Sequence, residues 1–296
     1  MSKTDPGRFF EDFRLGETIR HATPRTVTSG DAALYTALTG SRFALHSSDA
    51  FARALGHPRA PVDDLLVFHL VFGKSVPDVS INAVANLGYA GGVFLRPVYP
   101  GDTLSAVSEV IGLKQNSNGH TGIVYVRTRG EREDGAPVLD FSRWVMVAKR
   151  DPAAPAPAEH VPDLPERVDP AAFAGFAPAF DPAAYDPVLA GSPHRWGDYE
   201  PGERIDHAAG MTVEEAEHQL ATRLYQNTAR VHFDAFAARG TRFARRLVYG
   251  GHPISLARAL SHNGLGSALH VAAINGGRHV APLFAGDTLY AWSEIL

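Results

Sequence analysis

The stretch "GGVFLRPVYPGDTLSAVSEV" (Gly91 to Val110) recurs near the end of the chain as "GGRHVAPLFAGDTLYAWSEI" (Gly276 to Ile295). Ten of the twenty aligned positions are identical, at an offset of 185 residues. A long internal repeat is typical of duplicated structural units. The chain is therefore expected to contain two copies of one unit.

Two further blocks repeat at an offset of 186. "FFEDFRLGETIRH" (Phe9 to His21) aligns with "RWGDYEPGERIDH" (Arg195 to His207), and His46 aligns with His232. We expect a first unit over residues 1–150 and a second over 194–296. The second has two residues after Glu294 where the first has about forty after Glu109. It is expected to lack its last strands, which a longer chain or a partner would supply.

Residues 151–193 separate the two copies and are rich in Pro and Ala. Such a composition disfavours regular ladders and favours extended backbone. We expect a linker that crosses the surface of the paired units; a disordered tether in its middle is the alternative.

Each copy shows the same order of helices and strands. "SGDAALYTAL" has helical spacing with an N-cap at Thr28 or Ser29, and "DDLLVFHLVFGKS" and "HPISLARALSHNG" are more apolar helices. Alternating segments such as "TGIVYVRTRGERE" indicate strands, with Asn118-Gly119 as a hairpin turn. These patterns predict an α+β fold, with a sheet wrapped around a central helix in each unit. Two such units can join their sheets and protect two strand edges.

Composition limits the classes of function. The chain has 296 residues, a net charge of -4 and no cysteine. The charge argues against nucleic-acid binding, and the absence of cysteine excludes disulfides, thiolate metal sites and a Cys nucleophile. No signal peptide is expected from "MSKTDPGRFFEDF", and "LLVFHLVFG" is too short to span a bilayer. We expect a cytoplasmic protein that binds neither nucleic acid nor membrane.

The segment "YTALTGSRFALHSSDAFA" (35–52) resembles the hydratase motif of the MaoC-like, R-specific enoyl-CoA hydratases. That motif runs Tyr, Leu, Thr or Ser, Gly, Asp, any, Asn, Pro, Leu, His, Ala. "RPVYPGDTL" and "APLFAGDTL" are similar to the family's Pro-Val-x-x-Gly-Asp-x-Leu segment. More narrowly, blocks such as "DLLVFHLVFGKSVPDVSINAVANLGYAGG" and "EEAEHQLATRLYQNTARVHF" resemble the mesaconyl-CoA hydratases, also called β-methylmalyl-CoA dehydratases. The likeness covers nearly the whole chain.

This resemblance implies a double hotdog fold and the reversible addition of water to mesaconyl-CoA, giving β-methylmalyl-CoA. It implies no metal and no cofactor beyond the CoA of the substrate. The family's catalytic His falls on His46 and His232. Its catalytic Asp falls on Ser41 and Asn227, neither of which can act as a carboxylate base. Asp234 and Glu217 are the carboxylates nearest to His232 in the sequence.

The copies differ where the family uses the N–H of a Gly at the start of the central helix to bind the thioester oxygen. The second copy has Gly250 and Gly251 there, and the first has Asp63 and Asp64. A carboxylate would repel a developing oxyanion. We therefore expect the active site in the second copy, with His232 and Asn227, while the first copy shapes the pocket. Close backbone packing is the alternative explanation for the two glycines.

The implied substrate carries a free carboxylate, which a guanidinium can pair with bidentately. Arg230 lies within the His232 segment and is the preferred candidate, with Tyr225 as a second substrate contact. Arg223, Arg96 and Arg278 are further candidates, and for each of the four arginines a surface or structural role is the alternative. The Gly-Asp-Thr-Leu segments are expected to form turns rather than sites.

The first functional hypothesis is a CoA-ester hydratase/dehydratase, a hydro-lyase. The alternatives are an acyl-CoA thioesterase, because the hotdog fold hosts both chemistries, and a non-catalytic acyl-CoA binder, suggested by the missing Asp in both copies. A homodimer is a further open expectation.

Overall fold

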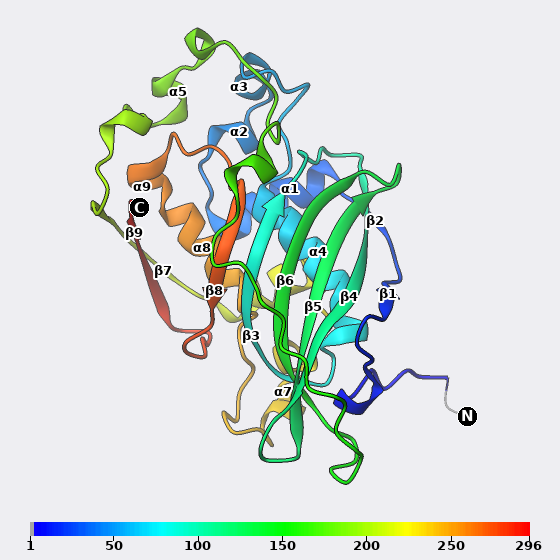
Figure 1. The fold of residues 1–296 in the computed structure, drawn as a ribbon. Helices are drawn as coiled ribbons and strands as arrows, with labels where there is room; N and C mark the ends of the chain where they lie inside the picture. Colours follow the sequence, from blue (N-terminus) through cyan, green and yellow to red (C-terminus); the bar gives the residue numbers. More distant parts are fainter. Residues whose placement is uncertain (1–2) are drawn as a thin grey trace.

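The fold is built on a seven-stranded antiparallel sheet that curls around one helix (Figure 1). The structure is a computed structural model and describes residues 3–296. The strands follow the order β1-β4-β5-β6-β3-β8, and β2 pairs with β4. Their bounds are β1 Thr18–Arg20, β2 Arg25–Thr26, β3 Ala83–Phe94, β4 Thr103–Gln115, β5 Thr121–Arg132, β6 Pro137–Ala148 and β8 Ala273–Arg278.

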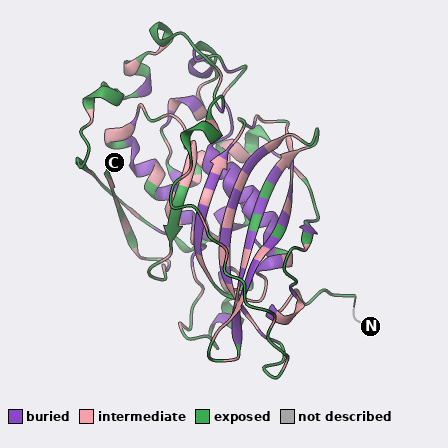
Figure 2. Cartoon of the chain, viewed as in Figure 1, coloured by how far each residue is buried: buried purple, intermediate pink, exposed green. Residues whose placement is uncertain are grey.

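Helix α4 (Asp64–Val79) fills the concave side of this sheet. It is buried on nearly every side, as Figure 2 shows, because its sequence is apolar all round. Leu66, Leu70 and Val71 are at most 1% exposed. Full burial of such a side chain stabilises the fold by about 1.5–3 kcal/mol. The helix is one turn longer than the sequence predicted, with Pro77 inside its last turn.

The other helices cover the open side and the ends of the sheet. Helix α1 begins as predicted, since Thr28 accepts a hydrogen bond from the Asp31 N–H at 3.1 Å. The bounds are α1 Ser29–Thr39, α2 Ala44–Ser47, α3 Asp49–Ala54, α5 Pro187–Ala190, α6 Glu215–Leu224, α7 Ala235–Ala238, α8 Gly251–Leu260 and α9 His262–Leu265. Short 3-10 helices are η1 Phe10–Asp12, η2 Pro170–Phe173, η3 Pro182–Ala184, η4 Trp196–Asp198 and η5 Arg230–His232.

The second copy joins the first through β8. This strand pairs with β3 so that Ala90 lies opposite Gly276 and Tyr89 lies opposite Gly277. Gly276 is the counterpart of Gly91 in the repeat, so equivalent segments face each other around a local two-fold axis. Such self-complementary pairing is the geometry of a symmetric interface. One strand of the second unit thus continues the sheet of the first, as the sequence allowed, while its other two strands form a sheet of their own.

The same contacts recur in both copies. His21 Nε2 lies 2.7 Å from Ser108 Oγ, and His207 Nε2 lies 2.9 Å from Ser293 Oγ. Strands β7 (Arg204–Thr212) and β9 (Thr288–Glu294) form a separate two-stranded sheet with the register of β1 and β4. The repeated sequence therefore produces a repeated structure.

The Gly-Asp-Thr-Leu segments are turns, as predicted. The Asp102 carboxylate accepts the N–H of Tyr99 at 2.9 Å, and Asp287 accepts that of Phe284 at 2.9 Å. Gly101 and Gly286 have φ of 112° and 93°, which favours glycine. These carboxylates serve the backbone and are not free for chemistry.

Residues 151–193 run as extended chain and short turns across the sheet. The backbone of His160 pairs with that of Leu113, and the Val168 N–H donates to Asn275 Oδ1 at 2.8 Å. Further on, the buried Phe176 ring packs against His270 at 4.8 Å. The segment thereby contacts both copies.

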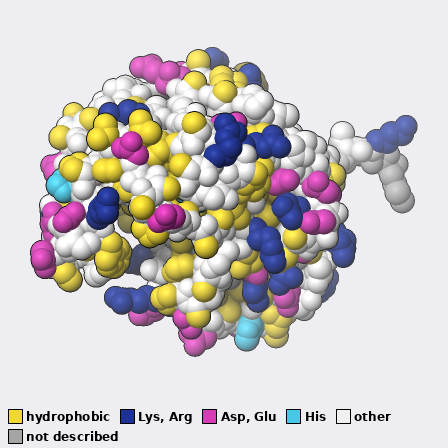
Figure 3. Space-filling view, turned by 90° about the horizontal axis from the view of Figure 1, so that it is seen from above, with side chains coloured by type: hydrophobic (Ala, Val, Ile, Leu, Met, Phe, Trp, Pro, Cys, Tyr) yellow, Lys and Arg dark blue, Asp and Glu magenta, His cyan; other side chains and the backbone are white. Residues whose placement is uncertain are grey.

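The surface mixes apolar and charged side chains. Figure 3 shows hydrophobic side chains across the middle of the upper face, with groups of Lys and Arg among them. Residues 3–296 contain no helix of the length and apolarity needed to cross a bilayer.

Candidate active site

The loop that carries His232 is held against the central helix of the other copy. A side chain at Gly73 of α4 would lie 1.9 Å from the Tyr225 carbonyl oxygen, so only glycine allows this approach. Lys74 Nζ donates to Gln226 Oε1, and Arg25 donates to the Leu224 carbonyl. The first copy therefore fixes the end of α6 and the residues that follow it.

The His232 ring is held in one tautomer by the backbone. Nδ1 lies 2.9 Å from the Leu247 carbonyl oxygen, and a carbonyl only accepts, so Nδ1 carries the proton. The neutral ring therefore presents Nε2 as a proton acceptor. Burial lowers the pKa of His232 to about 4, the Leu247 hydrogen bond partly offsets this, and the charge of His218 lowers it further. The ring is therefore neutral at pH 7, the form that a general base needs.

Gly250 and Gly251 start helix α8. Gly250 is its N-cap residue, and Gly251 is buried. Neither N–H donates a hydrogen bond within residues 3–296. Unpaired N–H groups at a helix start, together with the helix dipole, favour an anionic oxygen.

Ring packing also requires these glycines. A side chain at Gly250 would lie 2.5 Å from the His279 ring, and one at Gly251 would lie 2.5 Å from the Tyr249 ring. Tyr249 in turn contacts His232, with ring centroids 5.8 Å apart. The start of α8 and His232 therefore both border the Tyr249 ring.

The other three predicted residues lie at different depths. Asn227 is 3% exposed, and its Oδ1 accepts the Ala229 N–H at 3.0 Å, which leaves the NH2 group to offer a ligand. Arg230 is exposed on η5. Tyr225 is fully buried in the core, and its hydroxyl makes no hydrogen bond among the described residues. Its ring packs on His69 at 4.4 Å.

The first copy holds His46 in the same way. Its Nδ1 lies 3.2 Å from the Pro61 carbonyl oxygen, fifteen residues on, as Leu247 is fifteen residues after His232. The duplicated loops thus orient both imidazoles identically. The surroundings of the two rings differ.

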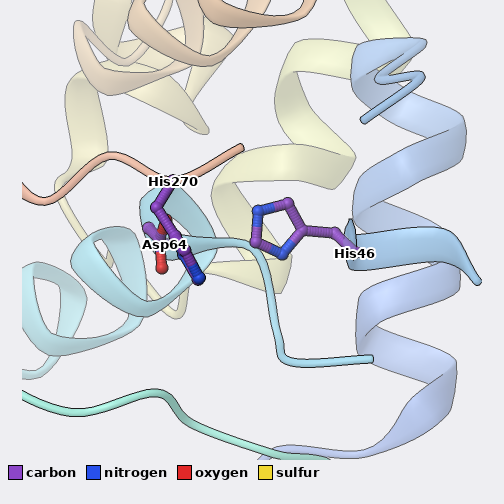
Figure 4. Close-up of side chains that lie close together, drawn as sticks. All are labelled: His46, Asp64 and His270. Carbon is purple, nitrogen blue, oxygen red and sulfur yellow. The ribbon is translucent and has the colours of Figure 1, made fainter. Parts of the chain in front are cut away.

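Acidic and aromatic side chains fill the first copy's site. Asp64 Oδ2 lies 3.0 Å from His270 Nδ1 and accepts the Val271 N–H at 2.8 Å, close to His46 (Figure 4). Burial alone would raise the pKa of Asp64, but these hydrogen bonds and the charges of His270 and His46 lower it. Phe43, the counterpart of Ala229, is 1% exposed and lies under the Arg258 guanidinium at 3.6 Å.

The cluster of His46, Asp64 and His270 is also the group best placed to hold a metal ion. Its ligand atoms lie within 4.8 Å of one another. Imidazole and carboxylate suit a divalent cation such as zinc. The His270–Asp64 hydrogen bond explains the spacing without a cation.

Several residues around the start of α8 were missed by the sequence analysis. His69 Nε2 lies 2.7 Å from Ser255 Oγ, which joins equivalent positions of the two central helices. Tyr89 OH lies 3.1 Å from His279 Nε2. These contacts cross between copies 180 or more residues apart, so local spacing gives no signal for them.

Two surface cavities lie away from His232. One, of about 500 Å³, is bounded by η1 and residues 155–158; the other, of about 300 Å³, is bounded by Arg42, residues 191–194 and residues 262–264. Neither is lined by a predicted catalytic residue.

Comparison with known proteins identifies the family. The model of the mesaconyl-CoA hydratase family matches residues 2–173. The β-methylmalyl-CoA dehydratase of Chloroflexus aurantiacus is 64% identical over 295 residues, covering 100% of this chain and 84% of the relative. The chain belongs to the mesaconyl-CoA hydratase family.

Further relatives agree with this assignment. The mesaconyl-CoA hydratase of Cereibacter sphaeroides is 62% identical, over 99% of this chain and 84% of the relative. A solved MaoC domain dehydratase from Chloroflexus aurantiacus has a TM-score of 0.94 and 62% identity, covering 99% of this chain and 84% of that one. A Mycobacterium tuberculosis protein described as a double hotdog has a TM-score of 0.77 and 31% identity, over 96% and 84% of the two chains. The double hotdog prediction is confirmed.

Proposed function

We propose that this member of the family hydrates mesaconyl-CoA reversibly to β-methylmalyl-CoA, with the chemistry in the second copy. Relatives at 64% and 62% identity over nearly the whole chain bear the names of this reaction. The observation that carries the site is the fixed tautomer of His232, whose Nε2 can accept a proton. Of the two copies, only the second has its loop histidine beside a helix that starts with glycines.

In the hydration direction, His232 Nε2 takes a proton from water. The hydroxide adds to the β-carbon of the enoyl thioester, and the electron pair of the double bond moves onto the thioester oxygen. The Gly250 and Gly251 N–H groups stabilise that enolate oxygen, and one such donor contributes about 3–4 kcal/mol. Protonation of the α-carbon by His232 restores the neutral ring and completes the addition of water.

Asn227 takes the position of the family's Asp but cannot take a proton. We assign its NH2 group to orient the water or the thioester. The exposed Arg230 suits an anionic part of the ligand near the surface. Tyr225 supports the loop through its buried ring, which packs on His69.

Loss of the enoyl thioester absorbance on mixing with mesaconyl-CoA tests this proposal. Release of free thiol instead would establish a thioesterase. Binding without turnover would establish an acyl-CoA binder, the alternative that the Ser41 and Asn227 replacements favour.

We also propose that the protein uses no cofactor beyond the CoA of its substrate, that it is cytoplasmic and that it forms a homodimer. The exposed Tyr290 and Trp292 of β9, 72% and 54% exposed, support association through the small sheet. Light scattering after size-exclusion chromatography measures the oligomeric state.

A further inference from the structure

Arg143 on β6 is a fully buried cation without an anionic partner. It is 0% exposed, and no carboxylate lies within ion-pair distance of it among residues 3–296. Removing a guanidinium from water costs several kcal/mol unless a counter-charge and hydrogen bonds compensate. A buried cation without a counter-charge is therefore a candidate partner for an anionic ligand.

The neutral partners of Arg143 satisfy it incompletely. One NH2 group donates to Ser75 Oγ at 2.9 Å, while its contacts to Ser80 and Asn86 are 3.3–3.4 Å long. Its Nε is buried and has no partner, and the same is true of Asn86 Nδ2 beside it. Two unpaired N–H donors thus adjoin one positive charge, and an incoming carboxylate with two acceptor oxygens could satisfy both.

Arg143 is linked to the surroundings of His232 by contacts through Phe72 and Tyr249. It lies opposite Tyr89 in the β3–β6 register, and the Tyr89 hydroxyl reaches His279, whose ring lies against Gly250. On the other side, Phe72 lies 4.4 Å from the guanidinium, and the Phe72 ring contacts Tyr249 at 5.4 Å. The guanidinium and the helix start assigned to the thioester oxygen therefore border one group of aromatic side chains.

We propose that Arg143, with Asn86, binds the free carboxylate of a dicarboxylic acyl-CoA whose thioester lies at Gly250 and Gly251. This inference rests on the proposed function. A four-carbon diacid chain separates its two carbonyl carbons by about 4 Å, given C–C bonds of about 1.5 Å, so its two ends can be held by groups that border one cluster of side chains. A carboxylate paired with a buried guanidinium is held strongly because the surroundings are of low polarity. An acyl-CoA ending in methyl would leave the buried charge unpaired, so the site selects diacids.

The test is equilibrium binding of two unreactive ligands, the carba-analogues of succinyl-CoA and butyryl-CoA. They share a four-carbon acyl chain and differ in carboxylate against methyl. The wild-type protein is expected to prefer the succinyl compound by about 10²-fold or more, since the butyryl compound leaves the buried guanidinium without its charge partner. Arg143→Met, of similar length, should remove the preference and leave butyryl affinity within about threefold.

Two more variants keep the test decisive if Arg143→Met fails to fold. Asn86→Ala removes the second unpaired donor and should reduce the preference about tenfold, the effect of one charge-assisted hydrogen bond. Arg129→Met, on the exposed part of β5, is the matched control and should change nothing. A preference of wild-type size in Arg143→Met or in Asn86→Ala, or an equal loss of both ligands in a folded variant, would overturn the proposal.

Failure of the proposed function gives a different result. A wild-type protein that prefers the succinyl ligand but leaves mesaconyl-CoA unchanged would refute hydration and keep the carboxylate site. A hydratase whose preference ignores position 143 would refute only the carboxylate site.

Discussion

The two copies orient His46 and His232 alike but surround them differently. Each ring donates Nδ1–H to a carbonyl fifteen residues later. Around His46, the first copy places Asp64 and Phe43; at the equivalent positions, the second has Gly250 and Ala229. The comparison teaches that the loop geometry alone does not make a site, because the space and charge around the imidazole decide whether a thioester can approach.

The largest expected effect separates the two histidines. His232→Ala should lower kcat for mesaconyl-CoA about 10²–10⁴-fold, the usual worth of a positioned proton-transfer group. His46→Ala should change kcat less than about threefold. Steady-state rates of both variants, with circular dichroism to verify folding, measure this. The reverse ranking would move the active site to the first copy.

A second prediction transplants the charge of the first copy into the second. Gly250→Asp places a carboxylate beside the developing enolate oxygen, and Gly250→Asn places a neutral group of the same size there. In both variants the new side chain would collide with the His279 ring, so both should be slower than the wild type. The Asp variant should be slower than the Asn variant by at least about tenfold, since like charges about 4 Å apart repel by several kcal/mol near a protein surface. Equal rates would show that the oxyanion does not form at this helix start.

The sequence predicted the duplication and the central helices because both leave local signals. The repeat fixes which segments are equivalent, and an apolar helix such as α4 has few other places to lie. It did not predict Arg143, whose contacts with Ser75, Ser80 and Asn86 depend on how β6 registers against β3 and α4. It also ranked Arg230 first for the carboxylate, although that side chain is exposed. The alternation of a strand shows which side chains point inward, but it does not show which groups an inward arginine contacts.

The third prediction concerns stability in the first copy. Asp64→Asn should lower the free energy of unfolding by about 1–3 kcal/mol at pH 7, because it weakens a buried, charge-assisted pair with His270. The folded-state pKa of Asp64 is lowered, so its contribution is present above the unfolded value of 3.8 and is lost as the pH falls through the folded value. Urea titrations at pH 7 measure the loss. Hydratase activity should stay within about twofold of wild type; a large loss would mean that the first copy takes part in the chemistry.

The smallest effect concerns the protonation of His232. Burial lowers its pKa to about 4 in the folded protein, against an ordinary value of 6.5 for histidine. Between these values the unfolded chain binds more protons, so stability rises with pH across this window, by up to about 1.4 kcal/mol per pH unit for one histidine. His232→Gln should flatten the slope of unfolding free energy between pH 4.5 and 6.5. The same low pKa keeps Nε2 unprotonated, so kcat/KM should stay level down to about pH 5 instead of falling near 6.5. An acid limb at 6.5 in the rate, with no change of slope in His232→Gln, would mean that solvent reaches this ring freely and that the two copies are less different than their packing indicates.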